Sequence, residues 1–151
     1  PGGVRSDLLC RGVPPCPVSY GDVFTMQPFG NALVVMTING AELHRLLEDQ
    51  HKPGRSSPTF LIPSRTMSYR WDARAPHGQR VKDLRVGGRP VEPTRELRVT
   101  VNSFLADGGD GFGVLRQGRQ RLGGELDLDA LTAYLASGPS PDPVPRITLE
   151  N

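Results

Sequence analysis

A short polar and aromatic segment of this chain has the composition of a ligand-binding loop. Residues 102–112 (NSFLADGGDGF) follow an apolar stretch directly, with Phe104 before a glycine-rich turn and Asp110 between two glycines of that turn. An ionised carboxylate held clear of its neighbours can accept two hydrogen bonds, such as those donated by the vicinal hydroxyls of a ribose. Because loops at strand ends commonly carry function, this segment is a candidate ligand site. A purely structural turn beside a core phenylalanine is the alternative.

A second segment, residues 27–31 (QPFGN), combines an aromatic turn with an amide. Phe29 on such a turn offers a flat face for stacking on a nucleobase, which is worth about 1–3 kcal/mol. Asn31 both donates and accepts hydrogen bonds, as reading a base edge requires. Arg5 follows a glycine turn, and its planar guanidinium suits a phosphate contact. The alternative for Phe29 is a place in the hydrophobic core.

Two stretches have the periodicity of amphipathic helices that would support these segments. Residues 41–50 repeat leucine at i, i+3 and i+4 after Asn39, a residue type favoured at the N-cap. Three charged residues of this helix are expected to face water: Glu42, Arg45 and Glu48. Residues 126–135 also repeat leucine, and two aspartates in their first turn complement the helix dipole.

The remaining apolar stretches are typical of β-strands. The continuous apolar run 33–38 predicts a buried strand, and residues 66–72 alternate between apolar and polar side chains. Further strands are expected at 60–62, at 97–101, and in a hairpin formed by 81–86 and 89–91 around two glycines. Residues 138–145 are too rich in proline for a helix or central strand. Two helices among about six strands predict an α+β fold with a mixed β-sheet, or a mixed α/β domain.

Composition excludes several classes of protein. A length of 151 residues fits one domain, and the 18 glycines and 15 prolines are typical of short elements joined by many turns. The net charge of +2 is too small to attract nucleic acid by bulk electrostatics. No run of 18 apolar residues predicts a membrane span. Because the chain begins at Pro1 instead of Met, we expect a processed form or an excised piece of a longer protein.

No complete catalytic site is apparent in the sequence. Asp49-Gln50-His51 spells D-x-H, a spacing used by metallophosphatases, but further ligand motifs are missing, so we interpret it as a chance match and expect no metal in this chain. Neither a hydrolase nucleophile motif nor a Walker loop occurs. Cys10 and Cys16 are close enough in sequence for a disulfide, as in an exported protein. Two free thiols in a cytosolic protein are the alternative.

Taken in order, these segments resemble the C-terminal domain of the 5′-nucleotidase family, which includes UDP-sugar hydrolases and 2′,3′-cyclic-nucleotide phosphodiesterases. The stretches that carry the resemblance are GGVRSDL (2–8), YGDVFTMQPFGN (20–31), 33–47, 69–72, NSFLADGGDGF (102–112) and ELDLDALTAYL (125–135). They cover nearly the whole chain. The resemblance implies the layered α+β fold of that domain.

The resemblance also implies a division of labour between two domains. In this family an N-terminal metallophosphatase domain holds two divalent metal ions and the catalytic His–Asp pair, and the C-terminal domain holds the nucleotide. Carried over by motif, Phe29 and Phe104 would enclose the base and Asp110 would bind the ribose hydroxyls. Asn31 would contact the base edge, and Arg5 would reach the phosphate or ribose. A nucleotide or nucleoside ligand, no cofactor in this chain, and a periplasmic or secreted location follow as expectations.

Two departures from the family pattern leave a second hypothesis open. The family has an asparagine before the G-G-[VI]-R segment; the sequence here starts at Pro1, so we expect that residue to be absent or cut away. Arg65 stands where the family tends to have a glycine that lets the backbone approach the base. The second hypothesis is a non-catalytic binding or interaction module that keeps the fold and has lost the nucleotide site.

Overall fold

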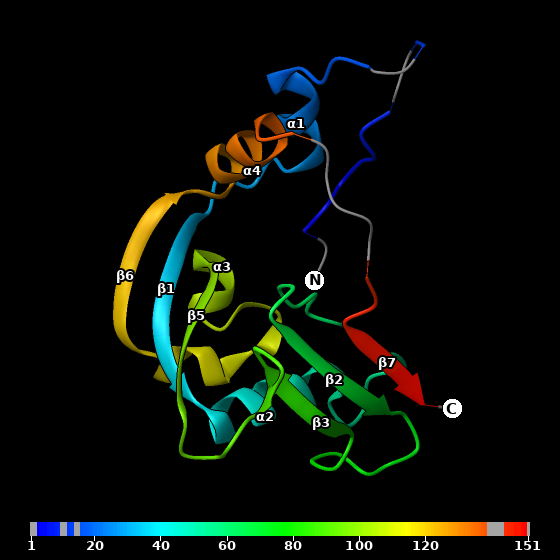
Figure 1. Cartoon of the computed structure of the whole chain (residues 1–151), viewed down its shortest axis with the longest axis vertical. Helices are drawn as coiled ribbons and strands as arrows, with labels where there is room; N and C mark the ends of the chain where they lie inside the picture. The colour runs from blue at the N-terminus through cyan, green and yellow to red at the C-terminus, as the bar shows by residue number, and fades with distance from the viewer. Residues whose placement is uncertain (1–2, 10–11, 14–15, 139–143, 151) are drawn as a thin grey trace.

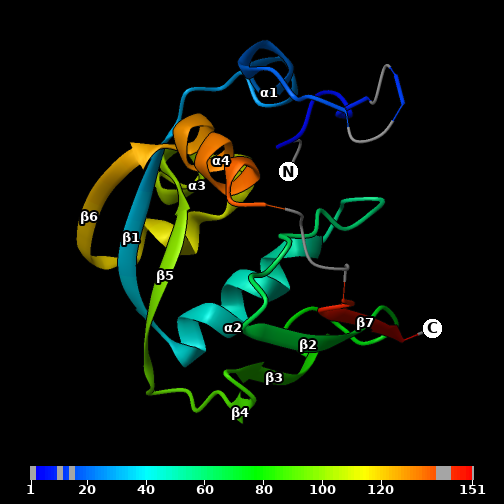
Figure 2. The same cartoon turned by 45° about the horizontal axis from the view of Figure 1, so that its top comes forward.

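Two β-sheets enclose one helix in this protein. The computed structural model describes residues 3–9, 12–13, 16–138 and 144–150. A three-stranded sheet and a four-stranded sheet lie on either side of helix α2 (Gly40–Glu48), as Figures 1 and 2 show. This arrangement is the mixed α+β fold that the sequence predicts.

The three-stranded sheet has the order β5-β1-β6 and is antiparallel throughout. Its strands are β1 (Ala32–Asn39), β5 (Glu96–Asn102) and β6 (Arg119–Leu126). The apolar run of β1 occupies the central position, with Met36 and Ile38 fully buried. The sequence does not predict β6, because all of its residues are exposed and only pairing with β1 makes it a strand.

The four-stranded sheet has the order β4-β3-β2-β7. It contains β2 (Met67–Asp72), β3 (Val81–Val86), the two-residue β4 (Arg89–Pro90) and β7 (Ile147–Glu150), which runs parallel to β2. The predicted alternation in β2 is confirmed, with Tyr69 and Trp71 buried. The short strand predicted at 60–62 is wrong: the Leu61 N–H donates to the Gln50 side chain (2.7 Å) in place of a neighbouring strand.

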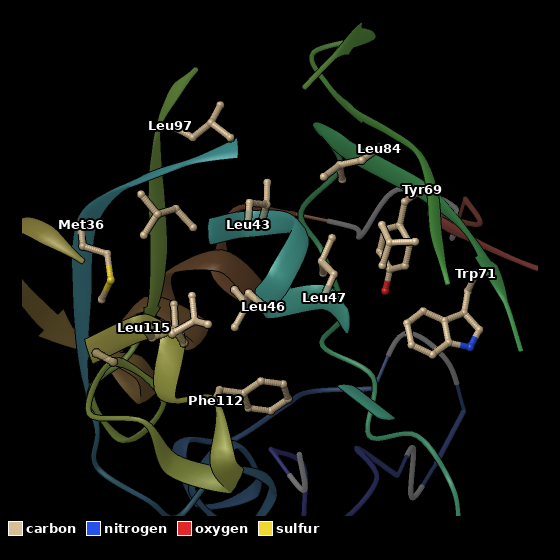
Figure 3. Close-up of a cluster of buried hydrophobic side chains, with 14 residues drawn as sticks. Met36, Leu43, Leu46, Leu47, Tyr69, Trp71, Leu84, Leu97, Phe112 and Leu115 are labelled. Atoms are coloured by element: carbon tan, nitrogen blue, oxygen red, sulfur yellow. The ribbon is translucent and has the colours of Figure 1, made fainter. Parts of the chain in front are cut away.

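Helix α2 joins the two sheets into one core. Asn39 caps it as predicted, and the Glu42 carboxylate accepts from the Asn39 N–H in return. Its three leucines lie between buried side chains of the two sheets, as Figure 3 shows: Leu43, Leu46 and Leu47 have Met36 and Leu97 to one side and Tyr69, Trp71 and Leu84 to the other. A 3₁₀ turn, η1 (Asp49–His51), follows the helix.

Glu48 contradicts the expectation that it faces water. Its side chain is only 1% exposed. The carboxylate accepts hydrogen bonds from the backbone N–H groups of Val81 (2.7 Å) and Gly78 (2.8 Å). Glu48 therefore fastens the end of α2 to the start of β3, and the position on the helix face that periodicity assigns to solvent is covered by the second sheet.

The remaining elements surround this core. The sequence predicts α4 (Asp127–Ala136) but misses α1 (Tyr20–Met26), a seven-residue helix that Ser19 and Asp22 cap reciprocally. Short helices α3 (Ser103–Ala106), η2 (Gly109–Gly111) and η3 (Gly113–Gln117) follow β5. Helices α1 and α4 lie side by side at one end of the molecule (Figures 1 and 2).

Two expectations from the sequence cannot be compared with the structure. Cys10 and part of the proline-rich segment 138–145, namely residues 139–143, lie outside the described residues. The disulfide between Cys10 and Cys16 therefore stays a prediction.

Candidate functional site

One cavity collects the residues that the sequence singles out for ligand binding. It has a volume of about 320 Å³. All five expected site residues line it, although they are spread along the chain from Arg5 to Asp110. Among the described residues, those that line it are Gly3, Arg5, Phe29, Asn31, Asn102, Phe104, Leu105 and Asp110. The structure thus brings the separate candidate segments to one place.

The register of the three-stranded sheet explains this convergence. Strands β1 and β5 are antiparallel, and Leu33 near the start of β1 lies opposite Asn102 at the end of β5. The segment before β1 and the segment after β5 therefore emerge at the same edge of the sheet. Strand β6 ends there too, with Leu126 opposite Ala32, so α4 begins beside the same edge. The cavity lies where these ends of β1, β5 and β6 meet.

Phe104 lies on the single helical turn α3, which separates β5 from the glycine-rich segment. The sequence does not predict this helical turn, so the glycine-rich segment begins one turn later than the end of the strand. Asn102 caps α3 by accepting from the Leu105 N–H (2.9 Å). Phe104 is 51% exposed, and a Cβ atom on Gly109 would lie 2.4 Å from its ring. A glycine is required at 109 because the backbone approaches the ring so closely.

Asp110 combines an unusual backbone conformation with a free carboxylate. Its φ of +53° lies in the left-handed region, which is costly for residues other than glycine and is often found at functional sites. Its carboxylate makes no hydrogen bond or ion pair with any described residue, whereas its carbonyl accepts from Arg55 (3.5 Å). Lys52 similarly donates to the carbonyl of Gly111. The loop is thus held through its main chain, and the carboxylate stays available.

Phe29 and Arg5 contact each other within the lining. Gly30 provides the turn into β1 with a φ of +62°, and Phe29 is 38% exposed. The Arg5 guanidinium carbon lies 4.9 Å from the centre of that ring, within reach of a cation–π interaction. The backbone N–H of Arg5 donates a hydrogen bond to the backbone carbonyl of Met26 (2.8 Å). Because Arg5 covers one face of the ring, stacking of a base on Phe29 requires the other face.

Asn31 is hydrogen-bonded to a buried residue, Asp127, that does not line the cavity and that the sequence did not single out for the site. Its side-chain amide donates to the Asp127 carboxylate (3.2 Å), and the Asp127 N–H donates to the Asn31 carbonyl (2.8 Å). Sequence reasoning also left out Asn102 and Leu105 as lining residues, although both lie within the motif it used. No local sequence motif marks Asp127 as part of the site, because only the fold places it near Asn31.

A third aromatic side chain lies close to this cavity. Phe60 lines an adjoining, largely apolar groove of about 500 Å³, which shares Gly3, Asn102 and Leu105 with the cavity. The Phe60 ring stands edge-on to Trp71, with centroids 5.4 Å apart. The groove thus extends the cavity towards the four-stranded sheet.

Other features of the sequence contribute nothing to this cavity. Arg65 is exposed and does not line it. The D-x-H residue Asp49 lies 3.6 Å from both Lys52 and His77. Within the described part of the chain, no three His, Cys, Asp or Glu side chains cluster so as to hold a metal ion. No described helix has the length and apolar character needed to cross a membrane.

Known proteins resemble this chain in both sequence and structure. The profile of the 5′-nucleotidase C-terminal domain matches residues 1–117. A probable 5′-nucleotidase of Treponema pallidum is 34% identical over 148 residues, covering 89% of this chain and 24% of that protein. The cell wall protein Lmo0130 of Listeria monocytogenes is 27% identical over 138 residues, covering 89% and 17%.

A solved structure agrees closely with the fold. The crystal structure of a 5′-nucleotidase precursor from Thermus thermophilus superposes with a TM-score of 0.83 and 34% identity, covering 99% of this chain and 30% of that one. The chain therefore spans less than a third of the length of each of these proteins. Together, these matches show that the chain belongs to the 5′-nucleotidase C-terminal domain family.

Proposed function

We propose that this chain is the nucleotide-binding domain of an exported 5′-nucleotidase-type phosphohydrolase. The observation that carries the proposal is the convergence of two exposed aromatic rings, a guanidinium, an amide and a free carboxylate on one cavity. Its volume of about 320 Å³ lies within the usual range for small-molecule sites, about 300–1,000 Å³. The ligand would be a nucleotide or nucleoside.

Each group has a role that its chemistry suits. Phe104 and the free face of Phe29 enclose the base, and the Asp110 carboxylate accepts from both ribose hydroxyls. Asn31 reads the base edge. Arg5, already beside Phe29, reaches the phosphate or ribose with its remaining N–H donors.

We assign hydrolysis and its divalent metal ions to another domain of the same protein. In this division of labour the chain binds and positions the nucleotide, and a metallophosphatase domain activates the attacking water. One observation supports this: relatives called 5′-nucleotidases extend well beyond the region that this chain matches. A periplasmic or secreted location is part of the proposal, supported by a relative called a cell wall protein.

A titration of the isotopically labelled chain with adenosine and AMP tests the binding role. The backbone amide signals of Phe29, Phe104 and Asp110 should shift with increasing ligand, while core residues such as Leu47 should not. Unchanged signals up to millimolar ligand would contradict nucleotide binding and favour the module that has lost its site. Metal-dependent release of phosphate from AMP by this chain alone would contradict the assignment of hydrolysis to another domain.

A further inference from the structure

The hydrogen bonds between Asn31 and Asp127 join a cavity-lining residue to the first residue of α4. The Asn31 amide nitrogen Nδ2 lies 3.2 Å from Asp127 Oδ2, and the Asp127 N–H donates to the Asn31 carbonyl over 2.8 Å. Side chain and main chain of Asn31 are therefore both held by the same residue. Among the five expected site residues, Asn31 is the one whose side chain is fixed by a buried carboxylate.

Asp127 is a carboxylate in a buried position. It is only 5% exposed, and its second carboxylate oxygen, Oδ1, is buried without a hydrogen-bond partner among the described residues. A buried polar atom without a partner costs stability, and such atoms call for an explanation. The position at the N-terminus of α4 offsets part of the cost, because the helix dipole favours a negative charge there. Among the described residues the carboxylate makes one side-chain hydrogen bond, to Asn31, and the helix dipole alone does not explain its burial.

The contact with Asn31 supplies a reason. A free asparagine amide can turn over and present either a donor or an acceptor to a ligand. An ionised carboxylate only accepts hydrogen bonds, so Asp127 holds Nδ2 towards itself and turns Oδ1 of Asn31 away. Because Asn31 lines the cavity, its side-chain oxygen Oδ1 is the atom left for the ligand.

We propose that Asp127 is a positioning residue. It holds the side chain of Asn31 with its amide oxygen Oδ1 towards the ligand, so that the cavity selects a base edge that donates a hydrogen bond. This inference rests on the proposed nucleotide-binding function. It adds a specificity determinant that does not itself touch the ligand.

Adenosine and inosine provide the test, because their base edges exchange donor and acceptor at two adjacent positions. The dissociation constants of both nucleosides are measured by calorimetry for the wild-type chain and for Asp127→Asn. The wild-type chain should prefer one of the two nucleosides. In Asp127→Asn the new amide can donate as well as accept, so Asn31 is free to turn over. The preference should then shrink by about fivefold, the worth of one ordinary hydrogen bond.

Matched variants separate positioning from a merely structural role. Asp129→Asn removes an exposed carboxylate from the same helical turn and should leave the preference unchanged. Asn31→Ala should abolish the preference, and adding Asp127→Asn to it should change nothing further. If Asp127→Asn does not fold, Asp127→Ser replaces it, because a hydroxyl also donates and accepts.

The outcomes distinguish this inference from the function on which it rests. If the wild-type chain binds neither nucleoside, the proposed function fails and the inference fails with it. If the wild-type chain binds both but shows no preference, or if Asp127→Asn weakens both equally, only the role of Asp127 is overturned. A reduced preference in a variant whose thermal unfolding matches that of Asp129→Asn supports it.

Discussion

Glu48 and Asp110 are both carboxylates near the ends of short elements, yet their surroundings differ completely. Glu48 is 1% exposed and accepts from two backbone N–H groups, at 2.7 and 2.8 Å. Asp110 is exposed, and its carboxylate has no partner within the described structure. A carboxylate with internal partners contributes to folding, whereas a carboxylate held in a costly backbone conformation without partners is available to a ligand.

The aromatic residues divide in the same way. Trp71 and Phe112 are almost fully buried in the core around α2, while Phe29 and Phe104 are 38% and 51% exposed at the cavity. Exposing a ring to water costs free energy unless something covers it. The comparison therefore predicts that core substitutions reduce stability and that cavity substitutions reduce binding at nearly constant stability.

The largest expected effect is that of Glu48→Ala. The variant removes the acceptor of two N–H groups: the bond from Val81 is buried, and an unsatisfied buried donor costs about 1–3 kcal/mol, whereas Gly78 is exposed and loses only an ordinary hydrogen bond worth about 1 kcal/mol. The free energy of unfolding in urea should fall by about 2–4 kcal/mol in total. Glu48→Gln keeps one accepting oxygen and should lose less. Equal stability of Glu48→Ala and the wild type would show that water replaces the carboxylate.

The prediction for core residues can also be tested through the pH dependence of stability that Tyr69 contributes. Burial raises the pKa of its hydroxyl to about 12, although the hydrogen bond with Gln50 acts in the opposite direction. Between pH 10 and 12 the unfolded chain loses this proton while the folded chain keeps it. Stability contributed by Tyr69 is thus complete below pH 10 and should fall by about 1.4 kcal/mol per pH unit in that window.

Tyr69→Phe is the matched variant for this titration, because it lacks the ionising hydroxyl and keeps the ring. The difference in unfolding free energy between wild type and Tyr69→Phe should decrease as pH rises from 10 to 12. A difference that stays constant with pH would mean that the hydroxyl is open to water.

Phe104→Ala tests the cavity side of the comparison. Loss of a stacking ring should weaken binding of adenosine by about 1–3 kcal/mol, a fivefold to hundredfold change in the dissociation constant. Thermal stability should change little, because half of the ring is already exposed. Phe24, 50% exposed and outside the cavity lining, provides the control. If Phe24→Ala weakens binding as much, Phe104 has no special role.

Of the four residues tested here, Asp110 has the smallest expected effect, measured in Asp110→Asn. That effect should be the most specific to recognition of the ribose. Asparagine tolerates the left-handed backbone and keeps one accepting oxygen, so stability should not change and adenosine should bind about tenfold more weakly. The preference for adenosine over 2′-deoxyadenosine should decrease as well. Asp83 is exposed, has a similar φ of +50° and lies outside the cavity, so Asp83→Asn is the matched control. Unchanged ribose preference in Asp110→Asn would remove Asp110 from the proposed site.

The success of sequence reasoning depended on how local each signal was. The helix α2 and the strands β1 and β2 were predicted because their apolar periodicity reflects burial directly. Strand β6 was missed because its residues are exposed and mostly polar or glycine, and its pairing with β1 is a property of the fold. Residues 60–62 were wrongly predicted as a strand because the apolar character of Phe60 and Leu61 reflects packing against the core and not a place in a sheet.

The sequence by itself determined which residues could bind a ligand: two aromatic turns, a glycine-flanked carboxylate, an amide and an arginine. Only the tertiary structure decided that they share one cavity, because the antiparallel register of β1 with β5 and β6 brings residues near 31, 102 and 126 to the same edge. The structure also decided that Glu48 and Asp127 are buried and which residues they bond, because their partners belong to segments far away in the chain. Local patterns report the chemistry of a side chain, whereas its partners depend on long-range pairing.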